Sequence, residues 1–136
     1  MNLLSAAGYS SLVIVGVGMD LTEVDRIASM VARWGDSFTH RIYTDGERAY
    51  ALARANSAMH LAARFAAKEA TLKALGVPSG LSWHEMEVVG GGREAPLLVL
   101  RGQALAAADK LGVVRMHLTL THTRDVAGAV VIAEAQ

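Results

Sequence analysis

The sequence RFAAKEATLKALG, residues 64–76, decides the fold because it combines a helix pattern with charges on an apolar face. At about 100° per residue, four apolar side chains fall on one stripe of this helix: Leu61, Phe65, Leu72 and Leu75. Lys68 lies within that stripe and Arg64 lies at its edge. Glu69 and Lys73 flank the stripe, one helical turn apart. A lysine in such a position loses its hydration, so its ammonium group must find an anion or a route to water.

The helix alone leaves two interpretations of these charges open. Two or three cations beside one carboxylate, at the rim of an apolar face, suit a bound phosphate and its metal ion. Alternatively, the Lys68 side chain extends to water, and Glu69 and Lys73 form a surface ion pair of the common, weakly stabilising kind. Taken by itself, the helix favours the second interpretation.

The composition limits the classes of protein that the chain can belong to. Its 136 residues predict a single domain over residues 1–136. Thirteen basic and thirteen acidic residues cancel, whereas nucleic-acid-binding domains usually carry a basic excess. The absence of cysteine excludes disulfides, a thiolate nucleophile and cysteine metal ligands. The apolar, alanine-rich composition leaves apolar surface that an oligomer interface can cover.

The N-terminal residues 1–18 are apolar enough to be tested as a targeting segment. They lack the basic region of a signal peptide, and Asp20 interrupts the apolar run. Gly8 to Ser11 break the run before it reaches membrane-spanning length. We therefore expect a short N-terminal extension over residues 1–12, followed by a strand, in a cytoplasmic protein.

The periodicity and the turn residues predict an α+β domain. The expected order is one strand, three helices, two strands, one helix and two strands. The corresponding ranges are 13–17, 22–34, 44–54, 58–75, 85–89, 97–101, 102–111, 116–121 and 126–133. Residues 22–25 resemble a capping box, residues 44–47 resemble a second helix start, and Gly76 suits the position that ends the long helix. We expect a mixed or antiparallel sheet packed on that helix.

Three polar residues are candidates for chemistry. Asp20 follows a buried strand and Glu69 flanks the long helix, and two such carboxylates can share a Mg²⁺ ion that substrate phosphates complete. A helix cap or turn is the alternative role of Asp20. His122 stands at a strand end, where it can donate to a phosphate, act as a base or cap a turn. The Gly16-Val17-Gly18 segment lacks the third glycine of a dinucleotide-binding motif.

Three motifs, in this order, resemble the holo-acyl-carrier-protein synthases, which are small 4′-phosphopantetheinyl transferases. They are GVGMDLTEVDRI at residues 16–27, RFAAKEATLKALG at residues 64–76 and TLTHT at residues 119–123. The resemblance extends from Val13 to Glu134, and the middle motif is the most specific of the three. It implies the α+β fold of that family and the transfer of 4′-phosphopantetheine from coenzyme A to a serine of an apo-acyl-carrier protein, with release of adenosine 3′,5′-bisphosphate.

The resemblance also implies roles for the residues that match the motifs. Asp20 and Glu69 would ligate the Mg²⁺ ion that bridges the pyrophosphate of coenzyme A. Lys73 would bind the phosphates and offset the charge that develops on them, which makes Asp20, Glu69 and Lys73 the catalytic set. The serine proton would pass to Glu69 or to a water on the metal ion, and the sequence leaves both open.

Further residues would bind the rest of the substrate and the carrier. The resemblance places three residues at the adenosine end and its 3′-phosphate, and a fourth in the same anionic pocket: Arg64, His122 and Thr123, with Lys68. Arg26, and Arg33 seven residues on, would dock the acidic carrier protein. Members of the family form homotrimers with coenzyme A in clefts between the subunits, which implies the same assembly here.

Two other functional hypotheses remain for comparison. In the first, the chain is a non-catalytic module that binds coenzyme A or a carrier protein. In the second, it is an assembly protein whose apolar surface is its function. The complete set of Asp20, Glu69 and Lys73 favours the enzyme over both.

Overall fold

The computed structural model describes residues 11–136 of the chain. The N-terminal extension expected over residues 1–12 lies, up to residue 10, outside the described residues. The elements follow in this order: β1 (Val13–Glu23), α1 (Val24–Trp34), α2 (Asp36–Ile42), α3 (Asp45–Leu52), α4 (Ser57–Ala74), η2 (Trp83–Glu85), β2 (Met86–Val89), β3 (Leu97–Leu100), α5 (Gly102–Lys110), β4 (Val113–His122) and β5 (Val126–Ala135). The α+β class expected from the sequence is confirmed.

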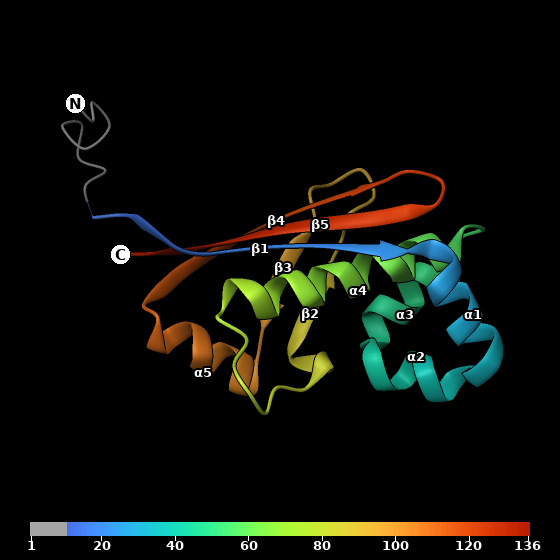
Figure 1. The fold of residues 1–136 in the computed structure, drawn as a ribbon, viewed down its shortest axis with the longest axis horizontal. Coiled ribbons are helices and arrows are strands. Elements are labelled where there is room, and N and C mark those ends of the chain that lie inside the picture. The colour runs from blue at the N-terminus through green and yellow to red at the C-terminus, as the bar shows by residue number, and fades with distance from the viewer. Residues whose placement is uncertain (1–10) are drawn as a thin grey trace.

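The main sheet has three antiparallel strands in the order β1-β5-β4, and β2 and β3 form a separate antiparallel hairpin. Figure 1 shows α4 lying along one face of the three-stranded sheet, with α1, α2 and α3 gathered at one end of α4 and α5 near the other. Both β1 and β4 are edge strands of this sheet. The sequence left open whether the sheet is mixed or antiparallel, and the observed sheet is antiparallel.

Glycines allow β1 to lie directly on α4. Gly16 and Gly18 point to the same side of β1, and a Cβ atom at either would overlap a backbone carbonyl oxygen of α4, that of Ala74 or that of Ala70. The alanines on α4 present equally little bulk to the strand. The sequence Gly16-Val17-Gly18 is thus a packing element, since only glycine lets two backbones approach this closely.

The long helix is buried on almost every side. Its buried residues include Leu61, Phe65 and a run of alanines, with β1 and β5 on one side and α1, α3 and β2 on the others. The Tyr43 hydroxyl donates a hydrogen bond of 2.9 Å to the Leu61 carbonyl and so ties the end of α2 to α4. A helix enclosed in this way carries few polar positions, and each of them must have a specific partner.

The structure differs from the sequence expectations at two places near the N-terminus. Residues 36–42 form a helix, α2, which the sequence analysis did not predict. The expected capping box at residues 22–25 is wrong: β1 continues to Glu23, and the Thr22 hydroxyl donates to the Asp20 carboxylate over 3.0 Å. By contrast, the helix start predicted at residues 44–47 is confirmed, and the structure shows a capping box there, because Thr44 and Glu47 bond reciprocally at the start of α3.

We expect Gly18→Ala to lower the free energy of unfolding by about 2 kcal/mol or more, because the added methyl group forces β1 away from the Ala70 carbonyl. Urea unfolding followed by circular dichroism measures the effect. Gly92→Ala is the control, since a Cβ atom there meets only the Tyr50 hydroxyl at an ordinary distance of 3.5 Å. Equal stability of the two variants would contradict the close packing of β1 on α4.

Candidate functional site

Asp20 and Lys73 meet at the free edge of β1. The Lys73 ammonium group donates to the Met19 carbonyl over 2.9 Å and lies 3.4 Å from Oδ1 of Asp20. The other Asp20 oxygen accepts the Thr22 hydroxyl. Both side chains keep access to solvent, Lys73 at 50% and Asp20 at 18% exposure. The structure therefore joins two of the three expected catalytic residues from elements more than fifty positions apart.

Glu69 lies on the stretch of α4 that faces Asp20. Gly18 contacts α4 at Ala70 and Gly16 contacts it at Ala74. Two residues of a strand span about 6.6 Å, and four residues of a helix span about 6.0 Å, so β1 and α4 stay in step along their contact. Two residues beyond Gly18, the strand residue Asp20 therefore lies opposite the helical turn of Ala66. Glu69 sits between those two turns and is half-buried, and no hydrogen bond or ion pair to it is recorded within residues 11–136. Its carboxylate is available for a ligand.

Lys68 occupies a different place from the one expected. It is completely buried, and its ammonium group lies 2.8 Å from Oε1 of Glu47, which is also completely buried. It further donates to the carbonyls of Trp83 and Met86, over 2.9 and 2.6 Å. With these three partners Lys68 has no open route to a ligand, and the prediction that it lines the anionic pocket is wrong.

Glu47 makes this ion pair possible. Its two carboxylate oxygens accept the backbone N–H groups of Thr44 and Val88, each over 2.9 Å, besides contacting Lys68. Burial lowers the pKa of Lys68 below its ordinary value, and the Glu47 carboxylate opposes that shift. The pair thus joins the start of α3, the middle of α4 and the β2 strand in one polar network inside the core.

Arg64 is also enclosed, but on another side of α4. It is 2% exposed, donates to the Gly90 carbonyl over 2.7 Å, and stacks with its guanidinium carbon 3.9 Å from the centre of the Tyr50 ring. Its Nε is buried and unpartnered among the described residues. Burial lowers the pKa of Arg64, while Tyr50 and Glu47 oppose the shift.

His122 stands at the end of β4, close enough to His60 on α4 to affect its pKa. The positive charges of Arg64 and Arg54, and the neighbouring His122, add to burial in lowering the pKa of His60. The Thr123 side chain accepts the backbone N–H groups of Asp125 and Val126 and so shapes the turn between β4 and β5. Neither His60 nor Arg54 was expected near the site from the sequence, although His60 precedes Arg64 by one helical turn.

Arg64 and Lys73 lie on different sides of α4. Nine residues separate Arg64 from Lys73, which turns the helix through about 900° and leaves the two side chains on opposite sides. Arg64 accordingly contacts Gly90 and Tyr50, whereas Lys73 contacts β1. His122 lies on β4, and β5 separates that strand from β1. The expected site residues therefore lie in two separate places, with Asp20, Glu69 and Lys73 in one and Arg64 and His122 in the other.

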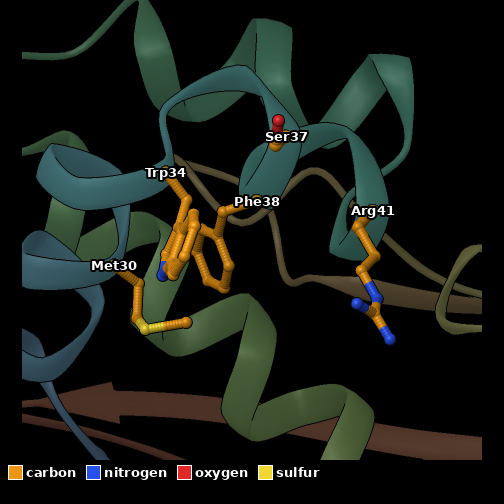
Figure 2. Close-up of a pocket in the computed structure, with 5 residues that line it drawn as sticks. All are labelled: Met30, Trp34, Ser37, Phe38 and Arg41. Carbon is orange, nitrogen blue, oxygen red and sulfur yellow. The ribbon is translucent and has the colours of Figure 1, made fainter.

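A hollow of about 260 Å³ lies between α1 and α2. In Figure 2 the side chains of Met30, Trp34 and Phe38 gather on one side of it, and Arg41 extends on the other. The Arg33 guanidinium lies over the exposed Trp34 ring, and Arg26 lies over Phe65. Both expected docking residues, Arg26 and Arg33, thus lie on α1 and are exposed.

The face of the sheet that turns away from α4 is apolar along β1. Its exposed side chains are Val15, Val17, Met19 and Leu21. On the neighbouring strand β5, Ile132 pairs with Val17 and Val130 pairs with Met19. On β4, His117 pairs with Ile132 and Thr119 pairs with Val130. The surface is thus apolar along β1 and β5 and becomes polar at β4, and exposed apolar surface is a common feature of protein interfaces.

Two absences hold for residues 11–136. No helix there is long and apolar enough to cross a bilayer. No cluster of three or more histidine, aspartate or glutamate side chains has the geometry to enclose a metal ion. A metal ion at Asp20 and Glu69 would accordingly need ligands from a substrate or from water.

Comparison with known proteins identifies the relatives of the chain. Residues 16–131 match the family described as the 4′-phosphopantetheinyl transferase superfamily. The chain is 50% identical over 124 residues to the holo-[acyl-carrier-protein] synthase of Anaeromyxobacter dehalogenans, and the match covers 89% of this chain and 96% of that protein.

Two solved structures of acyl-carrier-protein synthases superpose on almost the whole of this chain. A holo-(acyl-carrier-protein) synthase of Bacillus anthracis, in complex with CoA (3′,5′-ADP), superposes with a TM-score of 0.73 at 33% identity, covering 90% of this chain and 98% of that one. The acyl carrier protein synthase of Mycobacterium tuberculosis superposes with a TM-score of 0.69 at 37% identity, covering 91% and 100%.

We expect Lys68→Met to lower the free energy of unfolding by about 3–5 kcal/mol, because it leaves the Glu47 carboxylate buried without its counter-charge. The double variant Glu47→Gln with Lys68→Met should lose less than the sum of the single variants, and a double-mutant cycle by urea unfolding measures the difference. Lys110→Met, at an exposed position on α5, is the control. Additive losses would show that the pair is not coupled.

Proposed function

Since the chain belongs to the 4′-phosphopantetheinyl transferase superfamily, we propose that it is a holo-[acyl-carrier-protein] synthase. It transfers 4′-phosphopantetheine from coenzyme A to a serine of an apo-acyl-carrier protein. The observation that carries the proposal is the meeting of Asp20 and Lys73 at the edge of β1, beside the turn of α4 that presents Glu69. Relatives that match almost the whole chain bear the name of this activity.

The two carboxylates fit a Mg²⁺ ion. Mg²⁺ prefers hard oxygen ligands, and it is commonly held by one or two carboxylates while substrate phosphates and water complete its octahedron. Asp20 and Glu69 supply carboxylates from two elements in register, and Glu69 has no recorded partner within residues 11–136. Mg²⁺ bound by these residues would neutralise the diphosphate of coenzyme A and stabilise the charge that develops on it.

Lys73 supplies the second positive charge. Its ammonium group extends from α4, donates to the Met19 carbonyl of β1 and remains half-exposed. It can therefore donate to a phosphate oxygen while it keeps its hydrogen bond to β1. In the reaction the serine oxygen attacks the β-phosphorus, the bond from this phosphorus to the bridging oxygen breaks, and adenosine 3′,5′-bisphosphate leaves with that oxygen. Lys73 offsets the negative charge gained by the leaving group.

The serine proton needs an acceptor close to the attacked phosphorus. Glu69 is the candidate within this chain, because it is half-buried on the part of α4 that the register of β1 brings toward Asp20, and no hydrogen bond to its carboxylate is present in the described part of the chain. We assign it this role together with ligation of Mg²⁺. Arg64 and His122 form the half that receives the adenosine end, and Thr123 holds the turn that carries His122.

We further propose that the active assembly is a homotrimer. Asp20 lies on one edge strand of the sheet and His122 on the other, so a contact between the β1 edge of one copy and the β4 edge of another would bring the two groups of site residues, the half-sites, together at one interface. The exposed apolar residues of β1 give such copies a surface to bury. In a closed ring each interface is the same and every half-site is completed.

The carrier protein would dock on α1 and α2. Arg26, Arg33 and Arg41 supply positive charge for an acidic partner, and the hollow at Met30, Trp34 and Phe38 offers an apolar pocket between them. Aromatic residues and arginine around a small pocket are typical of the energetically important part of an interface.

We expect Asp20→Ala and Glu69→Gln each to abolish detectable transfer, because each removes a ligand for the ion that neutralises the diphosphate. The measurement is the intact mass of an apo-acyl-carrier protein after incubation with coenzyme A and Mg²⁺. Lys110→Met serves as the control and should modify the carrier at the wild-type rate. Full activity of the two carboxylate variants, or of the wild type with excess chelator, would exclude the proposed chemistry. Calorimetric binding of coenzyme A by the wild type without a mass gain on the carrier would favour a binding module.

We expect Val17→Glu to convert the trimer to a monomer and to remove transfer activity, because it places a charge at the centre of the apolar face. Val17 is exposed in the single chain, so unfolding stability should change by no more than about 0.5 kcal/mol. Sedimentation velocity gives the assembly state. Val17→Thr keeps the β-branched shape and should remain assembled. A monomeric wild type with full activity would overturn the assembly.

A further inference from the structure

Thr22 is a buried threonine whose hydroxyl group bonds to a carboxylate of the proposed metal site. It lies two residues beyond Asp20 on β1, and residues two apart in a strand point to the same face. The Thr22 hydroxyl donates to Oδ2 of Asp20 over 3.0 Å, and Thr22 is only 1% exposed. Its hydroxyl hydrogen is thus directed at one carboxylate oxygen and not at solvent.

The two oxygens of the Asp20 carboxylate have different surroundings. Oδ2 accepts the buried Thr22 hydroxyl, whereas Oδ1 lies 3.4 Å from the Lys73 ammonium group. That distance is long for a charge-assisted hydrogen bond, and Lys73 makes its shorter bond, of 2.9 Å, to the Met19 carbonyl. The contact with Thr22 is therefore the tighter of the two, and Oδ1 is the oxygen that is open to a ligand.

The sheet holds Thr22 firmly. Its backbone pairs with Ala127 of β5, and just beyond it the Val24 N–H donates to the Asp125 carbonyl over 2.9 Å. A β-branched side chain has few rotamers, and burial restricts Thr22 further. Asp20 is not β-branched and its side chain is 18% exposed, so its carboxylate can turn unless a neighbour holds it. Thr22 is a rigid neighbour of this kind.

We propose that Thr22 is a positioning residue of the active site, which orients the Asp20 carboxylate so that Oδ1 stays on the open side next to Lys73, where Mg²⁺ and the diphosphate would bind. The inference rests on the proposed function, in which Asp20 is a ligand of that ion. Groups that hydrogen-bond to a metal ligand fix its orientation, and their removal typically costs about 10- to 100-fold in metal affinity or activity. Thr22 does not touch the substrate and acts only through Asp20.

A purely structural role is the alternative, because a buried hydroxyl group needs a hydrogen-bond partner wherever it lies. Thr71 has that role on α4, where it is completely buried and its hydroxyl donates to the Ala67 carbonyl over 2.7 Å. Thr22 differs, since its hydroxyl donates to a carboxylate that keeps access to solvent. The two threonines form a matched pair, because removing either hydroxyl deletes one buried hydrogen bond, but only the loss at Thr22 frees a carboxylate.

The test measures the affinity for coenzyme A by calorimetry, with no carrier protein present, at a series of Mg²⁺ concentrations and in excess chelator. Thr22→Val keeps the β-branched shape and removes the hydroxyl group. It should raise the Mg²⁺ concentration that gives half of the metal-dependent gain in affinity by about tenfold, while the affinity in chelator stays within about twofold of the wild type. Thr22→Ser keeps the hydroxyl group and should behave like the wild type. Thr71→Val is the matched control and should leave the Mg²⁺ dependence unchanged.

If Thr22→Val fails to fold, Thr22→Ala removes the same hydroxyl group with a smaller side chain and is measured in the same way. An unchanged Mg²⁺ dependence, an equal loss of affinity in Mg²⁺ and in chelator, or the same shift in Thr22→Ser or Thr71→Val would overturn this inference and leave the proposed function in place. A wild type whose affinity for coenzyme A does not respond to Mg²⁺ would overturn the metal site on which the inference rests. A wild type that adds no mass to an apo-carrier would overturn the proposed function itself.

Discussion

The buried ion pair between Lys68 and Glu47 is the interaction on which the arrangement of the site depends. Both groups are completely buried, and the pair has hydrogen bonds to backbone groups at Thr44, Trp83, Met86 and Val88. These partners come from three separate parts of the fold, so the network fixes both the position of α4 along its axis and its rotation. The rotation decides which way the neighbouring residues point. Since Lys68 faces α3 and β2, Lys73 must face β1 and Glu69 must sit beside it.

The glycines of β1 complete this constraint. An ion pair that fixes the rotation of α4 would not bring Asp20 to Lys73 if bulky side chains held the strand away. Gly16 and Gly18 remove that bulk, and the alanines of α4 do the same from the opposite side. The apolar packing and the polar site are therefore one structure, because the contacts that place β1 also place its carboxylate.

Local signals in the sequence were sufficient for much of the fold. Thr44 and Glu47 are three residues apart and predict a helix start that the structure confirms, and Gly76 ends α4 with a φ of 81°. The partner of Lys68 could not be predicted in this way, because Glu47 is twenty-one positions earlier and nothing local to either residue indicates the contact. Thr22 shows the opposite case, since a suitable cap sequence was overridden by its pairing with Ala127 in the sheet. The opposite directions of Arg64 and Lys73 follow from their spacing alone, once the helix is known to be buried on all sides.

In the proposed assembly, the separation of the two half-sites gives the contact between copies a chemical role. A long ligand such as coenzyme A has two anionic regions, a diphosphate and a phosphate monoester, and a small domain has room for only one cationic cluster on each side of its central helix. Here one cluster accompanies the carboxylates at β1, and the other surrounds Tyr50 near β4. Placing both on one side would gather Lys73, Arg54 and Arg64 and would increase the repulsion between them in the free chain. If identical copies meet edge to edge, each contributes one cluster to a shared ligand, and repulsion within a single chain stays low until the ligand is present.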